Sequence, residues 1–422
     1  MSGLQVLFLA LYALAMAVRL ALHALNVRSL RSSGATVPGE FRGIVDEETL
    51  GKMRDYTLAT GRLGIVEHTA SDLILVALVL GGFLPWLNEG VSSLGAGFVP
   101  SGVIFFFALS LLLGLFELPF ELYGTFVVEK RFGFSTITLR TWVLDLVKTL
   151  LVSGVVLGAF LAVFFSLVAA SPKGWWLLAW LFFVAFQLLV SWLYPVVIAP
   201  LFNRFEPLAD PELLGGITSL AERTGIRVKG IFTMDAGTRS RHSNAYFTGI
   251  GKTKRIVLFD TLLDGHTHGE ILAVLAHELG HWKLGHVRKQ LALSATLSLA
   301  LFYGAFLAVT HKALYTAFGF PEVSLYAGLF LLTVFARPAG FLLSPLGAML
   351  SRRFERQADD YAYALTGSAD ALVSALKGLA TQNLSNLHPD PVYAWFSYSH
   401  PPLVQRIRRL KGLGERPSAT SR

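Results

Sequence analysis

The stretch LAVLAHELGHWKLGH, Leu272–His286, places two histidines four positions apart with a glutamate beside the first. Residues four apart lie on one face of a helix, so His277 and His281 can both direct a ring nitrogen at one metal ion. Glu278 lies about 100° further round the helix, from where its carboxylate can reach a water molecule beside the metal. Zinc would lower the pKa of that water, and Glu278 would take its proton. The H-E-x-x-H pattern is typical of zinc proteases.

The composition of the chain indicates an integral membrane protein. Of its 422 residues, 53% are hydrophobic and only 15% are charged, whereas soluble domains carry about 25% charged residues. The chain has no cysteine, which excludes disulfides, thiolate ligands and a cysteine nucleophile. The net charge of +8 fits an excess of Lys and Arg on the cytoplasmic side of a membrane. No basic stripe interleaves with aromatic residues, so we do not expect nucleic-acid binding.

Hydropathy predicts seven membrane spans, because a span needs about 20 mainly apolar residues. The motif GGFLPW interrupts the second span, and Pro338 and Pro345 are expected to kink or split the last one. The predicted spans are roughly Leu4–Leu25, Ser71–Leu87, Ser101–Tyr123, Val143–Ala170, Trp175–Ile198, Leu291–Thr310 and Val323–Leu350.

The charges of the loops predict the orientation in the membrane. Segments 26–70, 203–290 and 351–422 are rich in Lys and Arg, and so is the loop after the third span, whereas the alternate loops are nearly free of charge. The positive-inside rule then places the N-terminus outside and both large soluble segments on the cytoplasmic side. These two segments can therefore meet.

The two soluble segments are expected to form a small α/β domain. DPELLGGITSLAERTG predicts an amphipathic helix between Asp210 and Gly225, and VKGIFTMD, NAYFTG and KRIVLFD predict short strands. The predicted parts of the chain are a membrane region with five spans at 1–202, a catalytic segment at 203–290, two spans at 291–350, a second catalytic segment at 351–412 and a disordered tail at 413–422.

A catalytic zinc site needs a third protein ligand. His286 follows His277 by nine residues, which on a continuous helix turns it about 180° away, so we interpret it as an ordinary polar residue. SRRFERQADDYA offers a better ligand, because Glu355 can complete a His–His–Glu set. Asp359 lies on the same helical face and can accept a hydrogen bond from a ligating histidine.

Several motifs together resemble the type I CAAX prenyl protease family of membrane zinc metalloproteases of the gluzincin type. They are HELGHWKLGH, FERQADDYA, RHSNAYFTGIGKTKRIVLFDTLL and YSHPPLVQRI, with LPFELYGTFVVEKRFGF and PLFNRFEPLAD upstream. The resemblance covers nearly the whole chain and implies seven transmembrane helices around an intramembrane chamber that the zinc site faces. It also implies that His277, His281 and Glu355 bind one zinc ion and that Glu278 is the general base.

The resemblance implies further roles for residues near the zinc motif. Asn244 and Ala245 match edge-strand positions that hold the substrate backbone as an added strand would. His400 matches a histidine expected near the oxyanion of the tetrahedral intermediate. Arg406 lies near the same motif and is expected to contribute to substrate binding.

Water must reach the zinc, so polar residues inside the spans indicate where a chamber lies, since they rarely face lipid. Such residues are Glu117, Glu121, Asp145, Lys148 and Arg337. Most of them are expected to lie near the interface and to snorkel or pair, whereas Arg337 lies deepest in its apolar run and is the candidate for a chamber-facing residue. The Gly-rich, cysteine-free and compact sequence favours a bacterial origin and therefore an inner-membrane location. Its substrates would then include unfolded or stalled membrane proteins as well as prenylated ones.

The sequence also allows two hypotheses other than an enzyme, a channel or transporter and an inactive scaffold. A channel or transporter with a structural zinc site would show solute flux that survives Glu278→Gln. An inactive scaffold would lack the base or a ligand, whereas this sequence keeps Glu278 and all three ligand candidates.

Overall fold

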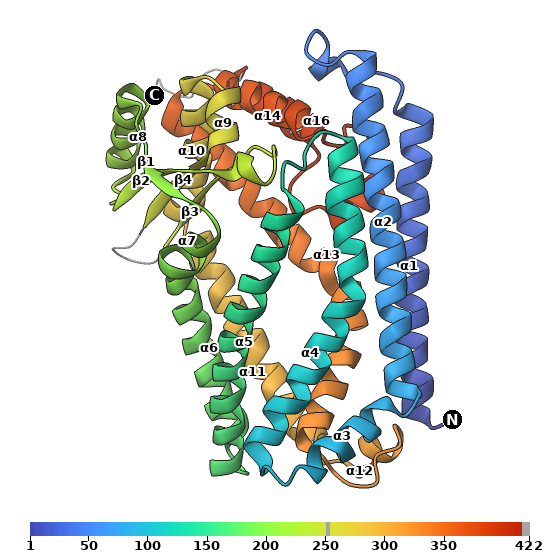
Figure 1. Cartoon of the computed structure of the whole chain (residues 1–422). Coiled ribbons are helices and arrows are strands. Elements are labelled where there is room, and N and C mark those ends of the chain that lie inside the picture. The colour runs from blue at the N-terminus through green and yellow to red at the C-terminus, as the bar shows by residue number, and fades with distance from the viewer. Residues whose placement is uncertain (250–253, 416–422) are drawn as a thin grey trace, which may run out of the picture.

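The computed structural model describes residues 1–249 and 254–415. The chain is mainly helical, and among the described residues seven helices are long and apolar enough to cross a membrane (Figure 1). These helices are α1 (Gly3–Ser33), α2 (Glu47–Leu80), α4 (Phe98–Tyr123), α5 (Leu139–Ala170), α6 (Trp175–Leu193), α11 (His286–Ala308) and α13 (Leu325–Thr366). Short π-helical turns, η2 (Gly124–Glu129) and η3 (Tyr194–Ile198), extend α4 and α6.

Six of the seven spans lie where hydropathy predicts them, and the second was placed too late in the chain. We expected a span over Ser71–Leu87, but α2 already begins at Glu47 and ends at Leu80. Its charged first turns are held helical by Asp46, whose side chain accepts a hydrogen bond from the Thr49 amide at 2.8 Å. Hydropathy detects only the apolar half of such a helix. The GGFLPW interruption is real, since Gly82 adopts a left-handed conformation before α3 (Phe83–Ser93).

The last span is one helix of 42 residues that contains both Pro338 and Pro345. The prolines were expected to kink or split this span, and the split is therefore wrong. Proline is tolerated inside membrane helices because neighbouring groups and local adjustment satisfy the freed carbonyls. The consequence is that one continuous helix runs from the membrane region into the catalytic domain.

Two separate hydrophobic cores lie at the two ends of the molecule. One joins the ends of the spanning helices near α3 and α12 (Lys312–Thr316), and the other lies in the catalytic domain. Between them, stretches of α4, α5, α6 and α11 contain no buried residue, at 110–127, 143–160, 180–194 and 287–297. Neighbouring helices still touch there, through the stacked rings of Phe160 and Phe182 and through the hydrogen bond from the Trp180 indole to the Ala295 carbonyl, but none of the four is enclosed by protein at this level.

Charged residues inside the spans form ion pairs with one another. Arg337, which we expected to face the chamber, lies 3.3 Å from the buried Asp72, which also accepts a hydrogen bond from Arg19 at 2.7 Å. Asp145 pairs at 2.8 Å with Arg239, which lies in the soluble segment between two strands of the sheet. Pairing of this kind is how charges are accommodated at membrane depth.

A four-stranded sheet forms the centre of the catalytic domain, with the strand order β1-β2-β4-β3. Strand β2 runs parallel to β4, and β3 pairs with β4 antiparallel, with Ala245 opposite Leu258. The three predicted strands are present, and β1 was missed because it is three residues long. The strands are β1 (Phe205–Pro207), β2 (Gly230–Met234), β3 (Ala245–Thr248) and β4 (Arg255–Phe259).

Helices surround the sheet and close the domain. Helix α8 (Pro211–Thr224) begins at Asp210 and ends at the left-handed Gly225, as predicted. The remaining helices are α7 (Ala199–Phe202), α9 (Asp260–Gly265), α10 (His268–Lys283), α14 (Asp370–Gln382), α15 (Pro391–Ser397) and α16 (Leu403–Gly414), with the single turns η1 (Gly39–Phe41) and η4 (Ala236–Thr238). The predicted tail at 413–422 overlaps the end of α16, and residues 416–422 lie outside the described residues.

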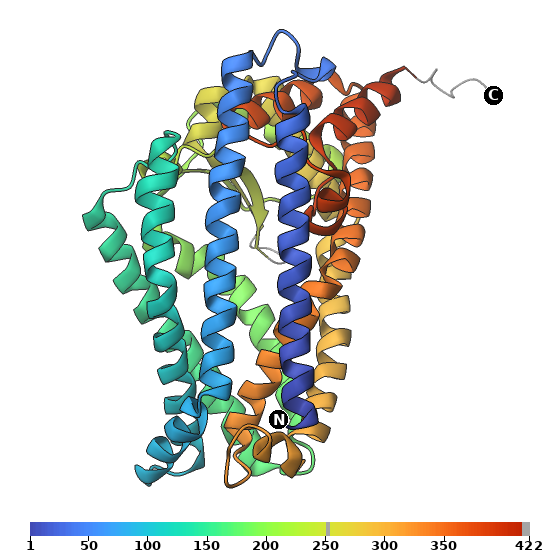
Figure 2. The same ribbon diagram turned by 90° about the vertical axis from the view of Figure 1, so that its right-hand side faces the viewer.

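The catalytic domain and the N-terminus lie at opposite ends of the helix bundle (Figures 1 and 2). Residues 203–285 and the chain after α13 meet at the same end, which is what the loop charges predicted for the two soluble segments.

Candidate metal centre

Three side chains from α10 and α13 form a cluster suited to a metal ion. His277 and His281 are separated by 3.1 Å between their Nε2 atoms. Each Nε2 atom also lies 3.3 Å from a carboxylate oxygen of Glu355. Ligands about 2.0–2.1 Å from a tetrahedral zinc ion are separated from one another by roughly 3.3 Å, so the spacing fits zinc.

The donor set of the cluster supports the same conclusion. Glu355 is 5% exposed, and its Oε2 atom has no hydrogen-bond partner among the described residues. Arg406 Nη1 lies 3.6 Å from this oxygen, beyond hydrogen-bonding distance, so a metal ion would supply the close partner that a buried carboxylate oxygen needs. The three ligands leave one position of a tetrahedral ion open, as a catalytic rather than a structural zinc site requires.

Local sequence signals place the two histidines on α10. Thr267 and Glu270 form a capping box that fixes the start of the helix. Gly280 lies directly against α13, since an added Cβ atom would come within 3.1 Å of the Ala358 Cα atom. The missing side chain at this position lets the histidine helix approach the glutamate helix closely.

Asp359 and Arg406 lie behind the first histidine. Asp359 Oδ1 is 2.9 Å from His277 Nδ1, which leaves the histidine's Nε2 atom to face Glu355. Arg406 donates to both oxygens of Asp359, and its Nη2 atom also lies 3.1 Å from His277 Nδ1. The side chains of Asp359 and Arg406 are 1% and 8% exposed, so the pair orients the ligand from inside the protein.

This position changes the interpretation of Arg406. We expected it to contribute to substrate binding, whereas its guanidinium is buried against Asp359 and His277. Its geometry favours a positioning role for the zinc ligands over direct contact with a substrate.

Glu278 follows the first histidine of the cluster on α10. Among the described residues it makes no hydrogen bond or ion pair. Burial raises the pKa of Glu278 above the ordinary glutamate value, against the opposing influence of His277 and His281. A raised pKa suits a group that must first accept a proton and then donate it near neutral pH.

His286 is not the ordinary polar residue that its position in the sequence predicted. It is buried, its Nδ1 atom lies 3.0 Å from His281 Nδ1, and its Nε2 atom lies 3.0 Å from Gln357 Oε1. The prediction that His286 lies about 180° away from His277 holds only for a continuous helix. Gly285 instead adopts a left-handed conformation, with φ 68°, that separates α10 from α11 and turns His286 back toward His281. The glycine before His286 was the signal that could have revealed this.

The residues expected to hold substrate lie at the start of an edge strand and, for His400, beside the metal cluster. Strand β3 is an edge strand, with β4 as its one neighbour among the described residues. Asn244, directly before β3, is exposed, whereas Ala245 is buried. The His400 Nε2 atom lies 3.3 Å from Glu355, and 61% of its side chain is exposed. A free strand edge and a histidine beside the third ligand therefore accompany the metal site.

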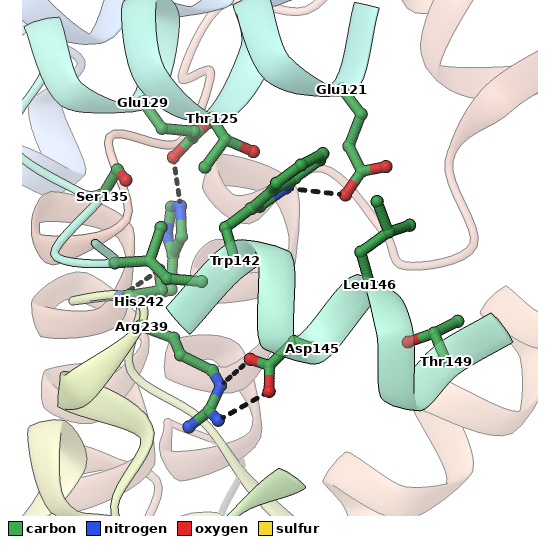
Figure 3. Close-up of a pocket in the computed structure, with 12 residues that line it drawn as sticks. Glu121, Thr125, Glu129, Ser135, Trp142, Asp145, Leu146, Thr149, Arg239 and His242 are labelled. Atoms are coloured by element: carbon green, nitrogen blue, oxygen red, sulfur yellow. Dashed lines mark hydrogen bonds and ion pairs between the residues drawn. The ribbon is translucent and has the colours of Figure 1, made fainter. Parts of the chain in front are cut away.

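A polar cavity of about 500 Å³ lies beside the segment that leads into β3. His242 is 3.2 Å from Glu129 and stacks on Phe134 with ring centres 3.9 Å apart. Figure 3 shows the other walls, where Glu121 accepts a hydrogen bond from the Trp142 indole and Asp145 pairs with Arg239. Glu121 and Asp145, two of the polar residues within the predicted spans, line this cavity.

Comparison with known proteins agrees with this geometry. Residues 26–204 match the family model "CAAX prenyl protease N-terminal, five membrane helices", and residues 207–413 match "Peptidase family M48". The chain is 36% identical to a CAAX prenyl protease 1 homolog of Arabidopsis thaliana, over 89% of this chain and 91% of the relative. It is 34% identical to CAAX prenyl protease 1 of Saccharomyces cerevisiae, over 91% and 90%.

A solved structure resembles the whole chain. The crystal structure of S. mikatae Ste24p superposes with a TM-score of 0.90 at 30% sequence identity, covering 97% of this chain and 99% of that one. The arrangement of spanning helices and catalytic domain is therefore that of a known membrane protein fold.

Proposed function

The chain belongs to peptidase family M48 and is a membrane zinc metalloprotease, and we propose that it removes the C-terminal tripeptide of prenylated proteins. The observation that carries this proposal is the His277–His281–Glu355 cluster with a free carboxylate, Glu278, beside it and an edge strand nearby. The names of the relatives, CAAX prenyl protease 1, support the choice of substrate. A channel or transporter gains no support from these findings.

We assign the metal ligands as His277, His281 and Glu355. Bound zinc would supply Lewis acidity and lower the pKa of a water molecule. Glu278 takes a proton from the attacking water and passes it to the leaving amine. Asp359 and Arg406 hold the first histidine in the tautomer that exposes Nε2 to the ion, and His286 does the same for the second.

The substrate peptide is proposed to bind as an added strand along β3. Backbone groups of the edge strand would pair with the peptide, and Asn244 and Ala245, at the start of this strand, would take part in that pairing. His400, at the rim and beside Glu355, is placed to donate a hydrogen bond to the oxyanion. Unburied apolar side chains of the spanning helices would accommodate a prenyl chain within the membrane.

We further propose that the N-terminus lies outside and that the catalytic segments face the cytoplasm. The Lys- and Arg-rich loops all lie on the catalytic side of the bundle. In a bacterial owner this membrane would be the inner membrane.

The test is cleavage of a farnesylated CAAX-type peptide by the purified full chain in detergent. We expect cleavage that a chelator abolishes, that Glu278→Gln reduces by at least about 100-fold as general-base loss predicts, and that favours the farnesylated peptide over the unprenylated one. Glu222→Gln, an exposed carboxylate on α8, is the matched control and should cleave normally. Equal cleavage by Glu278→Gln would refute the assigned base. Equal rates on both peptides would refute prenyl recognition and direct the search to unfolded membrane-protein substrates.

A further inference from the structure

A second cavity, of about 560 Å³, lies away from the strand edge and between the C-terminal end of α1, the catalytic half of α13 and the helices α15 and α16. Figure 2 shows the C-terminal helices, in red, beside the upper part of α1, in dark blue. We call this cavity the arginine pocket. Its lining residues are Ser29, Ser33, Arg352, Arg356, Leu387, His388, Pro389, Pro391, Ala394, Trp395, Pro401, Pro402, Val404, Gln405 and Arg408.

The arginine pocket carries an excess of positive charge. Three of its fifteen lining residues are arginines and none is Asp or Glu. Arg408 pairs with Glu40 outside the pocket, so its charge is balanced. Arg352 and Arg356 form no salt bridge within residues 1–249 and 254–415. Two cationic side chains one turn apart therefore face the same cavity without a carboxylate.

Arg352 is the residue that makes this a built site rather than a solvated basic surface. It is 8% exposed, and only its Nη1 atom has hydrogen-bond partners among the described residues, the carbonyl oxygens of Ala394 and Tyr398. Burying a charge without a counter-charge is strongly unfavourable. The remaining nitrogens of this guanidinium are free to bind an anion that enters the pocket.

The chemistry of the pocket fits a phosphate group. The planar guanidinium group binds phosphate oxygens through two parallel hydrogen bonds. The Ser33 hydroxyl and the Gln405 amide on the pocket wall add neutral polar groups that can contact the same anion. An anion bound here would balance both unpaired arginines at once.

The location of the pocket indicates that the phosphate belongs to a lipid. The pocket lies where α1 ends, directly after its apolar run, and next to Arg28 and Arg31 in the chain. On α15, Trp395 is 51% exposed and Val392 is 52% exposed. Trp is enriched at the level of the headgroups, and basic pockets between spanning helices on the cytoplasmic side bind anionic headgroups. We propose that the arginine pocket binds the phosphate of an anionic phospholipid headgroup.

The experiment uses the purified full chain in a neutral detergent, with phosphatidylglycerol, phosphatidylcholine or inorganic phosphate added separately. Bound lipid is counted by native mass spectrometry, and the melting temperature is followed as a function of lipid concentration. We expect phosphatidylglycerol to bind and to raise the melting temperature, and phosphatidylcholine to do so much less. Arg356→Gln, at an exposed position, should weaken phosphatidylglycerol binding about tenfold, as loss of one charge-assisted contact predicts.

Arg353→Gln is the matched control, because Arg353 is exposed on the same helix and does not line the pocket. Arg352→Gln is the second variant, and its folding is checked by its melting temperature without lipid. Equal binding by wild type, Arg356→Gln and a folded Arg352→Gln would overturn the assignment of the pocket. If Arg353→Gln weakened phosphatidylglycerol binding as much as Arg356→Gln does, general surface charge would explain the effect, and the assignment of the pocket would also be overturned. If inorganic phosphate raised the melting temperature as much as phosphatidylglycerol at equal concentration, the ligand of the pocket would be free phosphate and the lipid assignment would be refuted.

Discussion

Replacing Asp359 should weaken zinc binding although this residue is not proposed as a ligand. Asp359 Oδ1 lies 2.9 Å from His277 Nδ1 and 2.6 Å from Arg406 Nη2, and the carboxylate is 1% exposed. Asp359→Asn keeps the shape but offers one acceptor oxygen where the aspartate offers two. Its amide group must then face a donor, either the histidine or the arginine.

The size of the effect follows from the two partners. Loss of a carboxylate that orients a ligating histidine costs about 10–100-fold in metal affinity, or about 1.4–2.7 kcal/mol. Asp359→Ala should in addition destabilise the fold by about 3–5 kcal/mol, because it leaves the buried Arg406 charge without its main partner. Adding Arg406→Ala to Asp359→Ala should recover part of that stability, since the two residues are directly coupled.

The assay is competition for zinc between the protein and a chromophoric chelator, with the melting temperature recorded for the zinc-loaded and chelated forms. Asp360→Asn is the control, because Asp360 is the next residue, is half exposed and forms a surface pair with Arg409, which is worth about 0–1 kcal/mol. If Asp359→Asn and Asp359→Ala both bound zinc within twofold of the wild-type affinity, the orienting role of Asp359 would be refuted. A lower melting temperature with unchanged zinc affinity would leave Asp359 a structural role only.

Three further predictions test other parts of the site. His286→Ala should lower zinc affinity about tenfold by freeing the second ligand, while His268→Ala, at the start of α10, should not; both are read by chelator competition. Gly285→Ala should lower the melting temperature by a few degrees, since its left-handed φ costs other residues about 1 kcal/mol; an unchanged melting temperature would contradict the strained turn. Burial lowers the pKa of His242, but its bonds to Glu129 and Asn383 outweigh this and raise it above the ordinary value. The stability it contributes is therefore fully present below about pH 6.5 and is lost as pH rises through the raised pKa, so the melting-temperature difference from His242→Gln should shrink toward pH 9.

The features that the sequence predicted correctly are those with short-range physical causes. The apolar runs, the helix between Asp210 and Gly225 and the three strands each depend on residues within a few positions of one another. The metal cluster was predictable for a related reason, since i and i+4 spacing on two helices leaves few ways to place the donor groups. Only the contact between α10 and α13 is long-range. The loop charges had already predicted that the two soluble segments lie on the same side of the membrane.

The features that were missed depend on interactions between distant residues or on one backbone angle. The start of α2 could not be read from hydropathy, because its first turns carry charge and depend on a cap at Asp46. The position of His286 depends on the φ angle of Gly285. Arg406 could not be assigned a positioning role until its contact with Asp359, 47 residues away in the chain, was known.

The continuous α13 connects the membrane region, the arginine pocket and the metal site through one element. Arg337 pairs with Asp72 inside the membrane, Arg352 lines the pocket, and Glu355, the proposed zinc ligand, follows about one turn further on. At 1.5 Å per residue, the first and last of these lie about 27 Å apart along the helix axis. Because the helix is unbroken, any backbone movement that an anion on Arg352 causes would be passed on to Glu355. Lipid binding is therefore expected to change zinc affinity and peptidase activity together, whereas a change in activity at constant zinc affinity would place the effect of the lipid on substrate entry.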